Sequence, residues 1–134
     1  MKLTRRYRFS ASHRLDTPAL TPAENQQLYG KCNNPYGHGH DYVLDVTVEG
    51  AMDATGQVAD RRALDAIVDA KVLQRLDHKN LSTDVKDLAG VVATTENLAA
   101  AIRNALTEDW PLAARLARVR ISETARNIFE LEVR

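Results

Sequence analysis

Two stretches of alternating apolar and polar residues, each with histidine at one end, constrain the fold of this 134-residue chain most strongly. From Leu3 to His13 the odd positions are mainly apolar and the even positions polar, which is the period of a strand with one buried face. The same period runs from His38 to Val48, where the inward parity begins with His38 and His40. Antiparallel pairing joins the end of the first strand to the start of the second. We therefore expect the three imidazoles to lie at one edge of a sheet.

The remaining periodicity predicts two helices and a hairpin. Asp60 is a suitable N-cap for a helix with one apolar stripe, and Thr94 or Thr95 can cap a second helix that ends at Trp110. Alternation resumes near residue 118 and predicts two strands joined by a turn. Between the first two predicted strands, the segment from residue 15 to residue 31 is rich in turn-forming residues and predicts a long loop.

The order of these elements predicts a single α+β domain over residues 1–134. A four-stranded antiparallel sheet with both helices on one face satisfies a strand-strand-helix-helix-strand-strand order. The edge strands of such a sheet stay open, and proteins cover or pair such edges. We therefore expect oligomerisation by sheet extension.

The charge balance excludes several classes of partner. Eighteen Lys and Arg residues offset eighteen Asp and Glu residues, so no bulk field holds a nucleic acid or an anionic membrane surface. The apolar runs are too short for a membrane span, and no hydrophobic signal core is present. We expect a cytoplasmic protein, in which the single cysteine, Cys32, stays a thiol. The other interpretation of Cys32 is a small buried hydrophobe.

The three histidines have the composition of a metal site. Neutral imidazole is a common zinc ligand, and the Gly39 spacer lets His38 and His40 turn toward one point. Three histidines with an open fourth position are typical of catalytic zinc, whereas Cys32 as a fourth ligand makes a closed structural site. Such His-x-His pairs also occur as ordinary polar strand residues, so the pattern by itself leaves these alternatives open.

Two glutamates occupy unusual positions. Glu123 has the inward parity of its strand, where a buried carboxylate needs a partner such as a ligand with paired N–H donors. Alternatively, the strand ends before Glu123 and its side chain reaches water. Glu96 falls in the first turn of the second predicted helix, where an acid either stabilises the helix dipole or contacts a ligand.

Other polar residues are candidates for catalysis or phosphate binding. Asp77 and His78 adjoin in sequence, so they either relay a proton to a distant group or form an ordinary polar loop. Arg14 and Lys31 are candidates to meet substrate phosphates, although the basic residues near the N-terminus belong mainly to a solvated strand face.

Taken together, the motifs closely resemble the 6-pyruvoyl-tetrahydropterin synthase and 6-carboxytetrahydropterin synthase family. They occur in family order over almost the whole chain, at Phe9–Leu15, Tyr29–His40, Leu76–Leu81, Thr94–Asn97 and Ser122–Thr124. The resemblance implies a T-fold subunit whose trimers close their sheets into a barrel, with two trimers forming a homohexamer and active sites between subunits.

The resemblance also implies a role for each candidate residue. Zn²⁺ would be held by His13, His38 and His40. Cys32 would be the proton-moving thiolate, with its pKa lowered by cationic surroundings, and Asp77 with His78 would complete the catalytic group. The pterin would be recognised by Thr94, Thr95, Glu96 and Glu123.

The implied reaction is a zinc-dependent carbon-oxygen lyase reaction. It converts 7,8-dihydroneopterin triphosphate to 6-pyruvoyl-tetrahydropterin with loss of triphosphate. The carboxy-forming relatives use the same substrate in queuosine (7-deazaguanine) biosynthesis, but the five residues between Cys32 and His38 resemble the pyruvoyl-forming enzymes. Tyr36 departs from the asparagine of animal members, and it stands where the substrate side chain is expected. A three-histidine zinc hydrolase and a non-catalytic pterin-binding or structural zinc module are the other classes considered.

Overall fold

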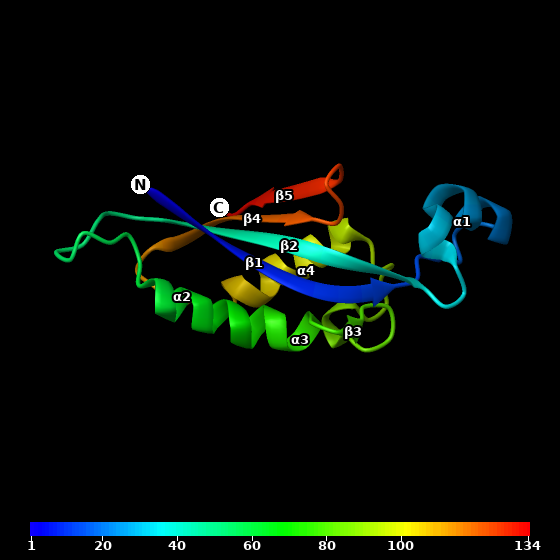
Figure 1. The fold of residues 1–134 in the computed structure, drawn as a ribbon, viewed down its shortest axis with the longest axis horizontal. Helices are drawn as coiled ribbons and strands as arrows, with labels where there is room; N and C mark the ends of the chain where they lie inside the picture. Colours follow the sequence, from blue (N-terminus) through cyan, green and yellow to red (C-terminus); the bar gives the residue numbers. More distant parts are fainter.

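A mixed sheet of five strands with helices on one face forms the body of the protein, and the computed structural model describes all residues, 1–134 (Figure 1). The strand order is β3-β1-β2-β4-β5. The strands are β1 (Lys2–His13), β2 (His38–Glu49), β3 (Lys79–Asn80), β4 (Arg115–Ser122) and β5 (Ile128–Glu132). Four of them, β1, β2, β4 and β5, pair antiparallel as predicted.

The pairing of β1 with β2 confirms the expected meeting of the histidine-bearing ends. Lys2 lies opposite Glu49 at one end of the ladder, and His13 lies opposite His38 at the other. His40 lies opposite Ala11, on the same face as His13. The register therefore places all three histidines at the end of the sheet where β1 finishes and β2 begins.

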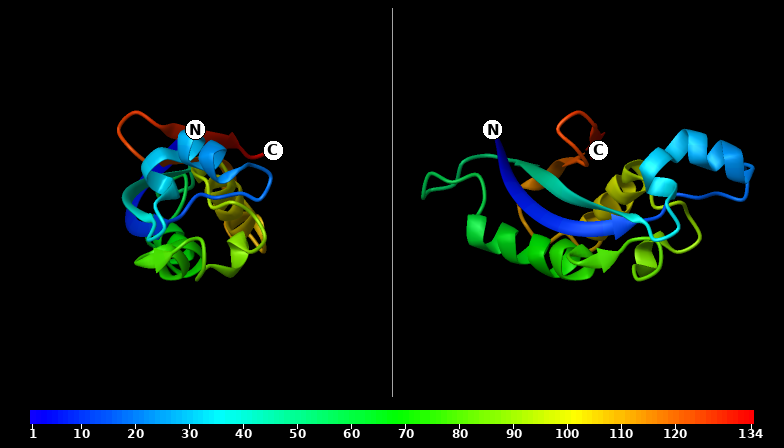
Figure 2. Two further views of the ribbon diagram at one scale, coloured as in Figure 1. Left: turned by 90° about the vertical axis from the view of Figure 1, so that its right-hand side faces the viewer. Right: turned by 45° about the vertical axis from the view of Figure 1, so that its right-hand side comes forward.

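The predicted helices both form and cover the same face of the sheet (Figure 2). Asp60 caps α2 (Arg61–Val68), which continues through a π-helical turn (Asp69–Leu73) into α3 (Gln74–Leu76). Thr94 caps α4 (Thr95–Thr107) through a hydrogen bond that its hydroxyl accepts from the Asn97 amide. Twenty-three buried residues fill the layer between helices and sheet. Burial of one face of each element thus supplies the main stabilisation.

Two features of the sequence prediction are wrong in detail. The expected loop over residues 15–31 contains α1 (Pro22–Tyr29), which lies beyond the ends of β1 and β2, followed by a 3₁₀ turn (Gly30–Asn33) (Figure 1). A capping box between Thr21 and Glu24 starts this helix, although it has no apolar stripe. The expected four-stranded sheet gains β3, which pairs parallel with the end of β1. No helix is both long and apolar enough to cross a bilayer.

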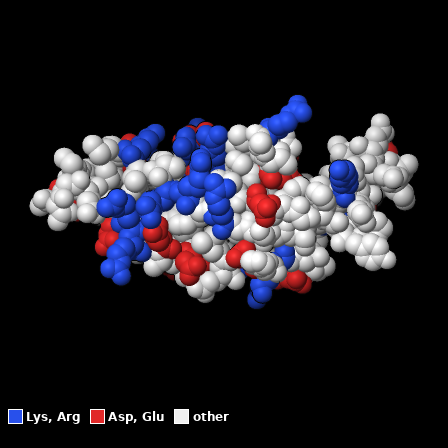
Figure 3. All heavy atoms as spheres, viewed as in Figure 1, with Lys and Arg blue, Asp and Glu red and all other residues white.

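The face of the sheet away from the helices is polar. Charged side chains of both signs lie side by side on it (Figure 3), and the Arg6 guanidinium donates to both oxygens of the buried Asp45 carboxylate at 2.8 and 3.1 Å. Arg6 therefore holds the pKa of Asp45 below its ordinary value. This mixture of charges agrees with the balanced composition and gives the face no large field of one sign.

Candidate metal centre

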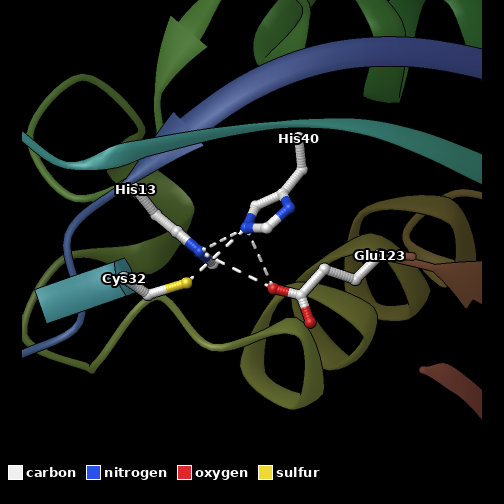
Figure 4. A group of neighbouring side chains, drawn as sticks. All are labelled: His13, Cys32, His40 and Glu123. Atoms are coloured by element: carbon white, nitrogen blue, oxygen red, sulfur yellow. Dashed lines mark hydrogen bonds and ion pairs between the residues drawn. The ribbon is translucent and has the colours of Figure 1, made fainter. Parts of the chain in front are cut away.

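Four side chains from distant parts of the chain converge at the end of the sheet (Figure 4). His13 ends β1, His40 lies on β2, Cys32 lies in the 3₁₀ turn after α1, and Glu123 follows β4. One nitrogen, sulfur or oxygen atom from each lies within 4.8 Å of every other. Their side chains point toward one another in the close-up view. This mixture of imidazole, thiol and carboxylate donors is one that zinc binds.

His13 is fully buried and its tautomer is determined by the backbone. Its Nδ1 lies 2.8 Å from the Ala93 carbonyl oxygen, which can only accept, so Nδ1 carries the proton. Burial lowers the pKa of His13, which favours the neutral ring. The lone pair on Nε2 is therefore directed into the cluster, with the second-shell support that metal-binding histidines usually have.

The other three donors surround that lone pair. His40 Nε2 lies 3.1 Å from His13 Nε2, and burial lowers the pKa of His40 as well. Glu123 Oε1 lies 3.2 Å from His40 Nε2 and 3.7 Å from His13 Nε2. Two neutral imidazole nitrogens facing each other beside a carboxylate require a proton or a cation between them. The residues present therefore fit a divalent cation.

His38, the third predicted zinc ligand, lies next to this group but outside the set of four. Its ring centroid is 4.7 Å from that of His40, in an edge-to-face arrangement. Gly37, with φ of +81°, turns the chain just before His38 and packs against the His13 carbonyl. His38 thus shares the site, while Cys32 and Glu123 occupy the positions closest to the two other histidines.

Cys32 lies close enough to the histidines to exchange protons with them. Its Sγ is 3.6 Å from His40 Nε2, and the residue is half-buried. Burial, and secondly the Glu123 charge, raise the pKa of the thiol. The expected thiolate is therefore not favoured by the chain alone, because a cation must offset both effects.

Asp77 and His78 form a dyad outside the four-residue cluster. Asp77 Oδ1 accepts the Ser10 amide at 2.9 Å, which is the main reason that its pKa is lowered, and it lies 3.0 Å from His78 Nδ1. The His78 side chain is 83 % exposed and lines a cavity of about 520 Å³ together with residues from the adjoining ends of β1 and β2, His40 among them. His78 also adopts φ of 60°, a left-handed backbone that is uncommon outside glycine. The dyad is therefore presented outward.

The start of α4 lies beside the cluster and carries the predicted pterin-binding residues. Thr94 is the N-cap, and Glu96 is exposed in the first turn. Thr95 is only 2 % exposed, and its hydroxyl has no hydrogen-bond partner within the chain.

Tyr42 is a residue of this region that the sequence analysis missed. It is fully buried and its hydroxyl also lacks a partner within the chain. Burial, followed by the charges of Glu123 and Cys32, raises the pKa of Tyr42, whereas the nearby Thr95 hydroxyl lowers it without reaching hydrogen-bonding geometry. A signal was present in the sequence, because Tyr42 has the same strand parity as His40.

A second cavity lies beside the Cys32 turn. It has a volume of about 760 Å³ and is lined by Arg14 and Lys31 together with polar and small residues of the α1 region. The two basic side chains singled out as phosphate candidates therefore reach one hollow, next to the residue that carries the thiol.

Comparisons with known proteins agree on one family. The family described as 6-pyruvoyl tetrahydropterin synthase matches residues 2–133. The chain is 47% identical to the human 6-pyruvoyl tetrahydrobiopterin synthase over 128 residues, which are 95% of this chain and 88% of the relative. It is 45% identical to the Drosophila melanogaster enzyme of the same name over 127 residues, or 94% and 76% of the two chains.

A solved structure leads to the same result. The 6-pyruvoyl tetrahydropterin synthase of Caenorhabditis elegans superposes with a TM-score of 0.90 at 38% identity, covering 100% of this chain and 96% of the other. Sequence and fold thus agree over nearly the whole length. The chain belongs to the 6-pyruvoyl tetrahydropterin synthase family.

Proposed function

We propose that this protein converts 7,8-dihydroneopterin triphosphate to 6-pyruvoyl-tetrahydropterin, releasing triphosphate and redistributing hydrogens within the substrate. The observation that carries the proposal is the position of the Cys32 thiol, 3.6 Å from an imidazole of a cluster that fits a divalent cation. The 42–47% identity to relatives named as pyruvoyl-forming synthases supports this product.

The metal in this proposal is zinc, held by His13, His38 and His40. Rotation of the His38 ring, which already contacts His40, completes a three-imidazole set that leaves Cys32 free. A zinc ion held there supplies Lewis-acid polarisation of the substrate's side-chain oxygens, which makes the neighbouring C–H groups more acidic.

Cys32 is assigned the movement of protons between substrate carbons. Its thiolate accepts a C–H proton and returns it at a neighbouring carbon, in a half-buried position that limits exchange with water. Asp77 orients the His78 ring through Nδ1, so that His78 presents its other nitrogen as a proton donor or acceptor.

We assign this dyad to the active site of a neighbouring subunit. Within one chain the His78 side chain is largely exposed and is not one of the four converging donors. The open edges of the sheet, at β5 and at β1 with its short partner β3, provide surfaces for sheet extension. A homohexamer of two trimers, with sheets joined into a barrel, would supply each cluster with a dyad from another copy.

Substrate recognition follows from the polar groups around the cluster. The Glu123 carboxylate accepts the paired N–H groups of the pterin, with Thr94, Thr95 and Glu96 at the start of α4 completing the ring contacts. Arg14 and Lys31 then meet the triphosphate in the cavity that they line.

The direct experiment is incubation of the zinc-loaded protein with 7,8-dihydroneopterin triphosphate and identification of the pterin by mass. The pyruvoyl product with triphosphate release is expected. A carboxyl product with acetaldehyde would place the protein in the other branch of the family. Cys32→Ala is expected to lose at least about 100-fold in turnover while retaining zinc, whereas full activity of this variant would favour a water-activating zinc hydrolase.

Mixed oligomers test the sharing of the site. Cys32→Ala and His78→Ala are each expected to be inactive alone. If the two residues come from different chains, co-refolding equal amounts restores up to about a quarter of the sites by random assembly. No recovery in mixed hexamers would show that both residues act within one chain.

A further inference from the structure

The buried hydroxyl of Tyr42 is the polar group of this region to which the mechanism above gives no role. An unpaired buried hydroxyl lowers stability, and native proteins keep few of them. The Thr95 hydroxyl is also buried and unpaired, and Thr95 lies two residues after Ala93, whose carbonyl bonds His13. Because both hydroxyls lie at the candidate site, we infer that their hydrogen-bond partner reaches them only when metal or substrate is bound.

The register places Glu123 across the sheet from Tyr42, which makes its carboxylate the nearest candidate for that partner. Val43 lies opposite Ser122, the last pair of the β2–β4 ladder. The next residue on β2 is Tyr42 and the residue that follows β4 is Glu123, and both have the parity that faces the helices. Glu123 is largely buried, with 13% of its side chain exposed.

Glu123 and a cation compete for the same two imidazole nitrogens. In this structure its Oε1 lies 3.2 Å from His40 Nε2 and 3.7 Å from His13 Nε2. A cation held by these two nitrogens occupies their lone pairs, so the Glu123 carboxylate cannot keep the same contacts. The Tyr42 and Thr95 hydroxyls lack another partner, so they can donate to the carboxylate once it leaves the imidazoles.

We propose that Tyr42 is the positioning residue for Glu123: with metal bound, its O–H and that of Thr95 donate to the Glu123 carboxylate and aim it at the pterin N–H groups. The inference rests on the proposed function, because it takes the pterin as the ligand. The Tyr42 ring is well placed for this role. It stacks on Phe9 at 5.0 Å and contacts the His40 ring edge-on at 5.7 Å, so little more than the O–H torsion remains to adjust.

Tyr42→Phe tests the proposal, because it removes one oxygen and keeps the packing. Tyr7→Phe is the matched control, since the Tyr7 hydroxyl donates to Asp65 at 2.7 Å. In metal-free protein Tyr7→Phe should lower Tm by roughly 2–6 °C. Tyr42→Phe should leave Tm unchanged or raise it, and a loss matching that of the control would show that the hydroxyl is already paired and would overturn the proposal.

The metal-bound state supplies the second readout. Both variants should bind one zinc per chain as the wild type does. Saturating zinc should raise the Tm of Tyr42→Phe less than that of the wild type. In a crystal structure of the zinc-loaded wild type, the Tyr42 hydroxyl should lie about 2.5–3.0 Å from a Glu123 carboxylate oxygen. The proposal would be contradicted if zinc raised the Tm of Tyr42→Phe as much as that of the wild type, or if the Tyr42 hydroxyl did not contact Glu123 in the zinc-loaded structure.

Pterin binding is the decisive readout. For 7,8-dihydroneopterin, which lacks the triphosphate, Tyr42→Phe should weaken binding about tenfold or more, and KM for the triphosphate substrate should rise more than kcat falls. Tyr7→Phe should alter neither value. Thr95→Val should weaken pterin binding less in the Tyr42→Phe background than it does in the wild type. If the wild type turns over the substrate and Tyr42→Phe binds pterin equally well, the positioning role fails while the proposed function stands. If the wild type neither binds nor converts the pterin, the proposed function itself fails.

Discussion

Gly37→Ala tests whether the turn before His38 sets the spacing of the imidazoles. Gly37 has φ of +81°, and a Cβ added there would lie 2.9 Å from the His13 carbonyl oxygen and 3.3 Å from its carbon. The clash is with backbone, which cannot rotate away as a side chain would. The end of β1, and with it the His13 ring, must therefore shift by a few tenths of an ångström.

The loss of stability expected for Gly37→Ala has two contributions. A left-handed backbone costs an L-residue about 1–2 kcal/mol, and overpacking against backbone costs roughly 1–3 kcal/mol more. Gly37→Ala should thus destabilise the metal-free protein by about 2–5 kcal/mol. Zinc affinity should also fall about tenfold or more, because metal sites tolerate only about 0.2 Å of error in ligand distance.

Two other glycines provide matched controls. Gly56 has φ of +80° and open space around its Cβ, so Gly56→Ala should show the backbone cost alone, with unchanged zinc affinity. Gly39 has neither feature, so Gly39→Ala should be neutral or slightly stabilising, by up to about 1 kcal/mol. Urea unfolding of metal-free protein and competitive zinc titration measure both effects. The reasoning is refuted if Gly37→Ala is no less stable than Gly56→Ala and binds zinc as tightly as the wild type.

Three further predictions follow from packing and charge. Arg6 lowers the pKa of Asp45, so the Asp45 carboxylate stabilises the fold above its unfolded pKa of about 3.8–3.9 and this stabilisation is lost as pH falls toward the folded pKa. Asp45→Asn should therefore make the free energy of unfolding, measured with urea at pH 3 to 6, depend less on pH. The same pH dependence in the variant and the wild type would contradict this. Leu98→Ala, at a fully buried site on α4, should cost about 2–5 kcal/mol, against less than about 0.5 kcal/mol for Val91→Ala at an exposed site. The buried Asn25 side chain bonds four backbone groups of the α1 region, so Asn25→Ala should speed hydrogen exchange there while the sheet exchanges as before; equal rates in the α1 region would show that these bonds do not hold it.

The convergence of the histidines could be predicted because strand period and antiparallel register act together. Alternation determines which residues face the helices, and antiparallel pairing joins the end of the first strand to the start of the second. His13 and His40 consequently lie on one face in the structure, with Nε2 atoms 3.1 Å apart. Glu123 was predictable on the same basis, because a carboxylate on an inward parity needs a partner.

The missed elements depend on contacts that periodicity does not contain. Helix α1 buries little apolar surface and relies on the Thr21 capping box and on Asn25, so it has no amphipathic pattern. Strand β3 has two residues and is held by backbone bonds near the end of β1, where the Leu81 amide donates to the Ser12 carbonyl at 2.7 Å. Such short pairings follow from tertiary packing rather than from local preference.

The details of the site depend on side-chain rotamers in the same way. Parity places His38, His40 and Tyr42 on one face, but it does not say which ring nitrogen meets Glu123 or which hydroxyl stays unpaired. Those facts follow from burial and from the backbone carbonyl of Ala93, which selects the His13 tautomer. They required the three-dimensional arrangement of α4 over the sheet.

X-ray absorption at the zinc edge of the loaded protein tests the central claim most directly. If His13, His38 and His40 hold the ion and Cys32 stays free for proton transfer, the first shell contains nitrogen and oxygen at about 2.0–2.2 Å and no sulfur. A sulfur scatterer at about 2.3 Å would make Cys32 a ligand in a closed site. That result would contradict the assignment of its thiolate to catalysis.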